Sequence, residues 1–146
     1  MIPYSTQTID QDDIKSVSKA LKSKFLTQGP KVIKFENSLS KLLHAKFCLT
    51  TNSASSALLL ACKVLGLKKN DIAWTVPNTY VATANAIIHS GLKIDFVDID
   101  KDTYNISIDK LSQKLFIAKK KKKLPKLIIP VHFSGLPCDM KRLKDL

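Results

Sequence analysis

The sequence has few of the residues that mark disulfide-rich, zinc-binding or membrane-spanning proteins. Its three cysteines, Cys48, Cys62 and Cys138, stand far apart and form no CxxC pair. An odd, dispersed set argues against a disulfide framework and favours a reducing cytoplasm. The three histidines are equally scattered, so we expect no metal site. No apolar run approaches the roughly 20 residues that cross a bilayer, and residues 1–7 lack a signal-peptide pattern.

Arginine is almost absent, although the chain is strongly basic. The formal net charge is +12, and Arg142 is the only arginine. A net positive charge can mark a protein that binds nucleic acid. Arginine, however, is the side chain that forms paired hydrogen bonds to guanine edges and to phosphates. The densest run, residues 119–123, is all lysine without interleaved aromatics, and we interpret it as a solvated connection. We therefore expect no specific nucleic-acid partner; a non-specific binding module remains a rival interpretation.

The sequence does contain an alternation of strand and helix patterns. Two helices are expected first, over residues 10–23 and from Pro30 onward. Further helices are expected at 55–65, 79–89 and 107–118 and from Asp139, and strands at 46–50, 72–75, 94–97 and 127–131. Repeated strand–helix units predict an α/β domain with a mostly parallel sheet. Residues 140–146 follow a helical pattern with no cap or tail, so we expect a truncated chain.

The loops after the expected strands carry the residues that could bind a ligand, because ligands of open α/β sheets bind at the carboxyl ends of the strands. After the first expected strand, residues 51–57 are small and mostly hydroxyl-bearing and open a helix. Their N–H groups and hydroxyls would suit a phosphate. The alternative is plain capping of the helix by serine. The segment is neither a P-loop nor a GxGxxG turn.

Two further side chains follow expected strands. Tyr80 stands at the start of a helix, where its ring could lie against a flat ligand or could serve only for packing. His132 follows the last expected strand and could contact a ligand or be purely structural. No nucleophile, base and orienting group can be assembled from these residues. The residues alone thus predict an α/β domain with a phosphate-type anion site and an adjacent aromatic ring.

Six ordered segments of the chain resemble the DegT/StrS-type sugar aminotransferases. They are residues 26–30, 35–36, 52–58, 77–85, 96–100 and 130–135, and they span nearly the whole chain. The resemblance implies the α/β large domain of a fold-type-I PLP-dependent transferase. That domain is a three-layer α/β/α arrangement with a mostly parallel sheet, and here it would be incomplete. Residues 1–146 would form its N-terminal part, with the remainder and a C-terminal domain absent.

The resemblance also implies roles for individual residues. A pair of serines matches the residues that hold the phosphate of pyridoxal 5′-phosphate, an aromatic residue matches the one that stacks on its pyridine ring, and a loop matches residues near the substrate. These are, in order, Ser55 and Ser56, Tyr80, and Thr27, Gln28 and Gly29. Relatives usually have threonine at the first serine and phenylalanine or tryptophan at the tyrosine. His132 matches a strand-end position without a firm role.

Two segments that the family requires do not occur in the sequence. One supplies an aspartate to the pyridine nitrogen, and the other supplies the Schiff-base lysine. We therefore expect no catalytic residue in the chain and no activity from it alone. The sheet would also lack strands and expose pairable edges, so we expect the isolated chain to fold poorly or aggregate.

For the longer protein, the resemblance implies transamination of a UDP-linked 4-keto-6-deoxy amino sugar with L-glutamate as donor. Segments such as 102–106 and 137–140 resemble the transaminases of pseudaminic acid synthesis. Such enzymes are usually homodimers. Two alternatives remain open: a dehydratase relative of the same fold, with histidine in place of the lysine, and a fragment without function.

Overall fold

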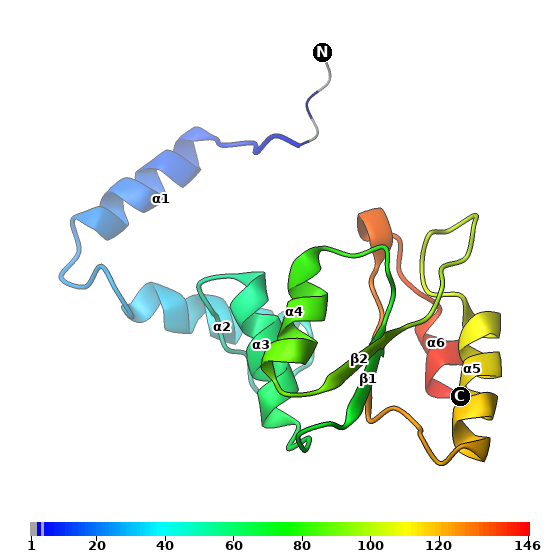
Figure 1. Ribbon diagram of the computed structural model, residues 1–146. Helices are drawn as coiled ribbons and strands as arrows, with labels where there is room; N and C mark the ends of the chain where they lie inside the picture. The colour runs from blue at the N-terminus through cyan, green and yellow to red at the C-terminus, as the bar shows by residue number, and fades with distance from the viewer. Residues whose placement is uncertain (1–2, 4) are drawn as a thin grey trace. The chain divides into compact units, whose positions relative to one another are not determined.

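The structure is a computed structural model that describes residue 3 and residues 5–146. It consists of two compact units, Met1–Thr50 and Thr51–Leu146. The first unit contains the helices α1 and α2, and all strands lie in the second unit (Figure 1).

The two helices of the first unit begin where the sequence predicts. Helix α1, Gln11–Leu21, starts after Asp10, whose carboxylate accepts hydrogen bonds from the N–H groups of Asp12 and Asp13. The side chain of Asp13 in turn accepts from the N–H of Asp10, which completes a capping box. Helix α2, Pro30–Leu42, has proline at its first position, where the missing N–H has no helical partner to lose.

The prediction of a strand at residues 46–50 is wrong: the segment forms no strand, and the described residues include no strand beside it. Phe47 and Leu49 are 78% and 85% exposed. The segment is instead tied to α2 by Glu36, whose carboxylate accepts from the N–H and the hydroxyl of Thr50, each at 2.8 Å. These two bonds, the N–H first, hold the pKa of Glu36 below its ordinary value. A strand needs a neighbour for its backbone groups, and a local pattern cannot show whether that neighbour exists.

The other three expected strands form one parallel sheet in the second unit. They are β1 (Ile72–Thr75), β2 (Lys93–Phe96) and β3 (Leu127–Ile129), and their order is β2-β1-β3. The first of these is therefore the central strand. The last is shorter than expected and ends before Pro130, which has no N–H to give to a neighbouring strand.

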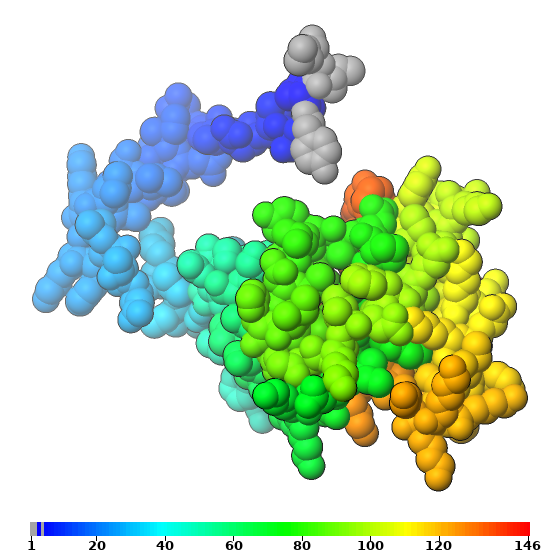
Figure 2. All heavy atoms as spheres, viewed as in Figure 1, coloured from blue at the N-terminus to red at the C-terminus, as the bar shows by residue number. Residues whose placement is uncertain are grey.

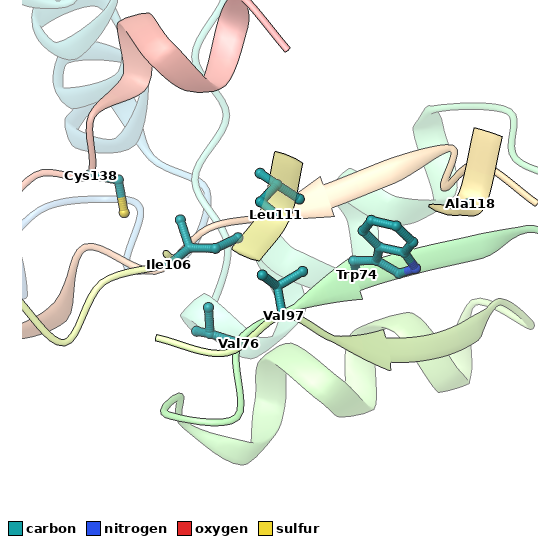
Figure 3. Packing of buried hydrophobic residues seen from close by; sticks show 7 residues of the cluster. All are labelled: Trp74, Val76, Val97, Ile106, Leu111, Ala118 and Cys138. Atoms are coloured by element: carbon teal, nitrogen blue, oxygen red, sulfur yellow. The ribbon is translucent and has the colours of Figure 1, made fainter. Parts of the chain in front are cut away.

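Helices cover both faces of this sheet and give the predicted three layers (Figure 1). Successive residues of β1 point to opposite faces. Ala73 packs with Ile87 of α4 (Val81–His89), and α4 packs in turn against α3 (Ala54–Val64). On the other face, Trp74 packs with Leu111 and Ala118 of α5, as Figure 3 shows. Helices α5 (Ile108–Lys120) and α6 (Met140–Lys144) form this second layer.

Helix α3 has exposed apolar side chains. Most of its residues are apolar, although Ser55, Ser56 and Lys63 are polar, and Cys62 is its one buried residue. Leu60 and Val64 are 51% and 79% exposed. These two residues stand four positions apart, so they are neighbours on one side of the helix and form an exposed apolar patch. Among the described residues, no helix is both long and apolar enough to cross a membrane.

Two neighbouring isoleucines of α4 provide a matched test of the core. Ile87 is fully buried, whereas Ile88 is 53% exposed. We expect Ile87→Ala to lower the free energy of unfolding by roughly 2–5 kcal/mol, because it removes methyl groups from a packed cluster. Ile88→Ala has the same change in helix propensity and should cost no more than about 0.5 kcal/mol. Urea unfolding of both variants, made in the full-length protein, measures the difference, and equal costs would contradict the packing described for α4.

Candidate functional site

Three of the residues predicted from the sequence lie around one pocket of about 320 Å³. Ser55 and Ser56 come from the first turn of α3, and Tyr80 immediately precedes α4. The other lining residues are Leu59, Val81, Ala82, Asn85, Ala86 and His89. Pockets for small molecules occupy roughly 300–1,000 Å³, so this one can hold a small ligand. Figure 2 shows α4 and the residues around it open at the surface of the second unit.

The electrostatic character of the pocket favours an anion. None of its lining residues carries a carboxylate. The N-terminus of α3 contributes the positive end of a helix dipole. Ala54 and Ser55 are the first two residues of this helix, and N–H groups at such positions have no intrahelical acceptor. Of these two residues, Ser55 lines the pocket, so a helix start with the favourable sign of field for an anion lies at its wall.

Different serines cap the helix and face the pocket. Ser53 is the N-cap, and its hydroxyl accepts from the N–H of Ser56 at 3.2 Å. The hydroxyl of Ser56 donates to Oδ1 of Asn52 at 2.7 Å. Within the described part of the chain, the hydroxyl of Ser55 makes no hydrogen bond. Ser53 thus caps the helix, while Ser55 lines the pocket with a hydroxyl that has no partner among the described residues. A role of Ser55 in ligand binding stays a prediction.

The ring of Tyr80 is free of the core. The residue is 78% exposed, and its extended backbone places it as the N-cap of α4 without a side-chain capping bond. This exposure argues against the packing role that the sequence left open. An exposed ring at the wall of a pocket offers an apolar face to a flat ligand.

The loop residues Thr27, Gln28 and Gly29 lie in the first unit, and their predicted contact with substrate stays a prediction. Gln28 has a positive φ of 49°. Gly29 is the N-cap of α2, and a Cβ at this position would lie 3.0 Å from the carbonyl oxygen of Phe25. The close approach of the Phe25 backbone thus explains on structural grounds why a glycine stands at position 29.

His132 has a structural partner. Its Nδ1 accepts a hydrogen bond from the N–H of Cys138 at 3.0 Å, and the thiol of Cys138 donates to the carbonyl of Val131 at 3.2 Å. Both bonds close the loop that follows β3. Of the two roles that the sequence left open, the geometry shows the structural one.

Asn105 is a residue that sequence reasoning missed. It is 4% exposed, and its carboxamide accepts from the N–H of Phe133 at 2.8 Å and donates to the carbonyl of Leu136 at 3.0 Å. These bonds fix a turn in which Ser134 has a φ of 51°. An asparagine between Tyr104 and Ile106 gives no local signal that it will bridge a segment some thirty residues away.

No strong nucleophile is present in the described residues of the pocket. The thiol of Cys62, on α3, is buried, and burial raises its pKa. A thiol with a raised pKa stays protonated and unreactive at neutral pH. The pocket therefore contains binding groups rather than a group that could carry out covalent chemistry.

Comparison with known proteins gives a consistent picture. The model of the DegT/DnrJ/EryC1/StrS aminotransferase family matches residues 7–146. The chain is 40% identical over 146 residues to a Campylobacter jejuni protein named UDP-4-amino-4,6-dideoxy-N-acetyl-β-L-altrosamine transaminase. That match covers 100% of this chain and 38% of the relative. The chain thus spans about a third of the length of the curated relatives it matches.

Two solved structures resemble the chain closely. One is Helicobacter pylori PseC, an aminotransferase of pseudoaminic acid biosynthesis, with a TM-score of 0.86 and 31% identity over 98% of this chain and 37% of that one. The other is the Escherichia coli GDP-4-keto-6-deoxy-D-mannose-3-dehydratase with bound hydrated PLP. It has a TM-score of 0.89 and 28% identity over 98% of this chain and 37% of that one. Both the fold and the family expected from the sequence are confirmed.

The separation of capping from binding can be tested by stability. We expect Ser53→Ala to lower the free energy of unfolding by about 1 kcal/mol, because the helix loses its side-chain cap. Ser55→Ala removes a hydroxyl that makes no hydrogen bond, so it should change stability by less than about 0.5 kcal/mol. Thermal or urea unfolding measures both. A larger cost for Ser55→Ala than for Ser53→Ala would reverse the assignment.

Proposed function

The chain belongs to the DegT/DnrJ/EryC1/StrS aminotransferase family, and we propose from this premise that it forms the cofactor-binding part of a pyridoxal-phosphate-dependent sugar aminotransferase. The observation that carries the proposal is the pocket that joins Ser55, Ser56 and Tyr80. In this proposal, residues 1–146 are the N-terminal part of the cofactor-binding domain of a longer, cytoplasmic enzyme.

The pocket fits a phosphate monoester attached to a flat ring. The N–H groups of Ala54 and Ser55 and the hydroxyl of Ser55 would hold the phosphate at the positive end of α3. The ring of Tyr80, which lines the same pocket and is largely exposed, would lie against the pyridine ring. Because no carboxylate lines the pocket, nothing there opposes the phosphate charge.

When bound, pyridoxal phosphate supplies the electron sink that amino-group transfer needs. This chain would contribute anchoring and orientation: Ser55 at the start of α3 would fix one end of the ligand, and Tyr80 would fix the plane of its ring. Its lysines do not include the one that the family resemblance requires, nor does it include the aspartate for the ring nitrogen. We therefore propose that the chain by itself is inactive and that both residues belong to the remainder of the protein.

The proposed reaction moves an amino group from L-glutamate to the 4-keto carbon of a UDP-linked 6-deoxy amino sugar. The names of the Campylobacter jejuni relative and of Helicobacter pylori PseC support this substrate class and a pathway of the pseudaminic acid type. The proposed working form is a homodimer. Thr27, Gln28 and Gly29 are proposed to lie near the substrate, as the family resemblance implies.

A second candidate is a sugar dehydratase of the same fold. The observation that favours it is the likeness to the Escherichia coli dehydratase, whose TM-score of 0.89 is as high as that of the aminotransferase neighbour. The described residues match both classes, because both would bind the same cofactor. A residue outside this chain, lysine or histidine, would separate them.

The reaction is tested with the full-length protein that contains residues 1–146. It is incubated with pyridoxal phosphate, L-glutamate and a UDP-linked 4-keto-6-deoxy amino sugar, and products are followed by NMR. Formation of the 4-amino sugar together with 2-oxoglutarate supports the proposal. Loss of a hydroxyl from the sugar without net transfer of nitrogen supports the dehydratase. Binding of neither cofactor nor sugar contradicts both.

The proposed stacking of Tyr80 makes a separate prediction. In the full-length protein, Tyr80→Ala should weaken binding of pyridoxal phosphate about tenfold, because a ring contact is lost. Tyr80→Phe keeps the ring and should stay within about twofold of the original affinity. Titration of the apoprotein with cofactor, followed by fluorescence, measures both. If Tyr80→Phe were as damaging as Tyr80→Ala, the hydroxyl rather than the ring would be the binding group.

A further inference from the structure

The hydroxyl and the N–H of Ser56 are both engaged with the segment that precedes α3. The hydroxyl of Ser56 donates to Oδ1 of Asn52 at 2.7 Å, and its N–H donates to the hydroxyl of Ser53 at 3.2 Å. The two serine hydroxyls also lie 3.1 Å apart, within hydrogen-bonding distance. A separate bond, from the hydroxyl of Thr51 to the carbonyl of Ser53 at 2.8 Å, steadies the same loop.

The number of protons fixes the direction of these bonds. A serine hydroxyl has one proton to donate and can accept two. Because the proton of Ser56 goes to Asn52, the bond between the two hydroxyls must run from Ser53 to Ser56. Ser56 then has no proton left for a ligand, whereas Ser55, one residue earlier on the same pocket wall, has its hydroxyl proton available.

We infer that Asn52 is a positioning residue that withholds the hydroxyl of Ser56 from the phosphate and leaves this contact to Ser55. The inference rests on the proposed function, since it concerns the same phosphate site. Asn52 does not line the pocket; it acts through Ser56. For Ser56 to turn toward a phosphate, its hydrogen bond to Asn52 would first have to break.

A double-mutant cycle on cofactor affinity tests this coupling in the full-length apoprotein. With Asn52 present, Ser56→Ala should change the Kd for pyridoxal phosphate by less than about twofold. In the Asn52→Ala background the released hydroxyl becomes a phosphate donor, so Ser56→Ala should raise Kd by about five- to tenfold. Ser55→Ala should raise Kd by about five- to tenfold whether or not Asn52 is present.

Thr51→Ala is the matched control, because it removes a hydrogen bond from the same loop without releasing the proton of Ser56. In that background the effect of Ser56→Ala should stay below about twofold. Pyridoxal, which lacks the phosphate, should show none of these differences. An equal cost of Ser56→Ala with and without Asn52 overturns the inference. Absence of any cofactor binding by the unsubstituted protein overturns the proposed function instead, so the two failures are distinguishable.

Discussion

The second unit depends on the burial of β1 between two helical layers. Ala73 and Trp74 are 0% and 2% exposed and point to opposite faces of the sheet. One clusters with Ile87 of α4, and the other with Leu111 of α5. Because side chains on both faces of β1 pack against helices, the direction and the position of the strand are fixed. The segment from Val76 to Tyr80 follows β1 directly and therefore starts from a fixed position. The packing of β1 thus determines where the pocket lies.

Three features that favour binding meet at the same edge of the sheet. The N-terminus of α3 supplies donors, the start of α4 supplies an aromatic ring, and the lining contains no carboxylate. None of them supplies a base or a nucleophile. In the proposed function, recognition and chemistry are assigned to different parts of the family fold, and this chain, about a third as long as its relatives, is proposed to contain the first without the second.

Local patterns predicted the elements well where the partner of an element was also local. Helices with their own caps, such as α1 after Asp10, begin where the sequence indicated. Three apolar runs were also recognised as strands, although β1 and β3 pair across the whole segment that contains α4, β2 and α5. Residues 46–50 failed because a strand is defined by its neighbour, and the described chain offers none. The role of Asn105 was not predicted for a related reason. Its side chain hydrogen-bonds to Phe133 and Leu136, and the residues next to it in the sequence do not indicate such distant partners.

For the serine-rich segment, the sequence leaves helix capping and anion binding as alternatives, but in the structure these two roles do not exclude each other. Hydroxyl residues at a helix start can accept from N–H groups that have no helical partner, or can donate to an anion. The segment contains three serines, and their hydroxyl groups have different partners. Ser53 turns back onto the helix and caps it, Ser56 points to Asn52, and Ser55 remains without an internal partner. A helix start that is already capped keeps its geometry before a ligand arrives, so its remaining N–H groups are preorganised for one. In the proposed phosphate site, capping therefore supports anion binding rather than competing with it.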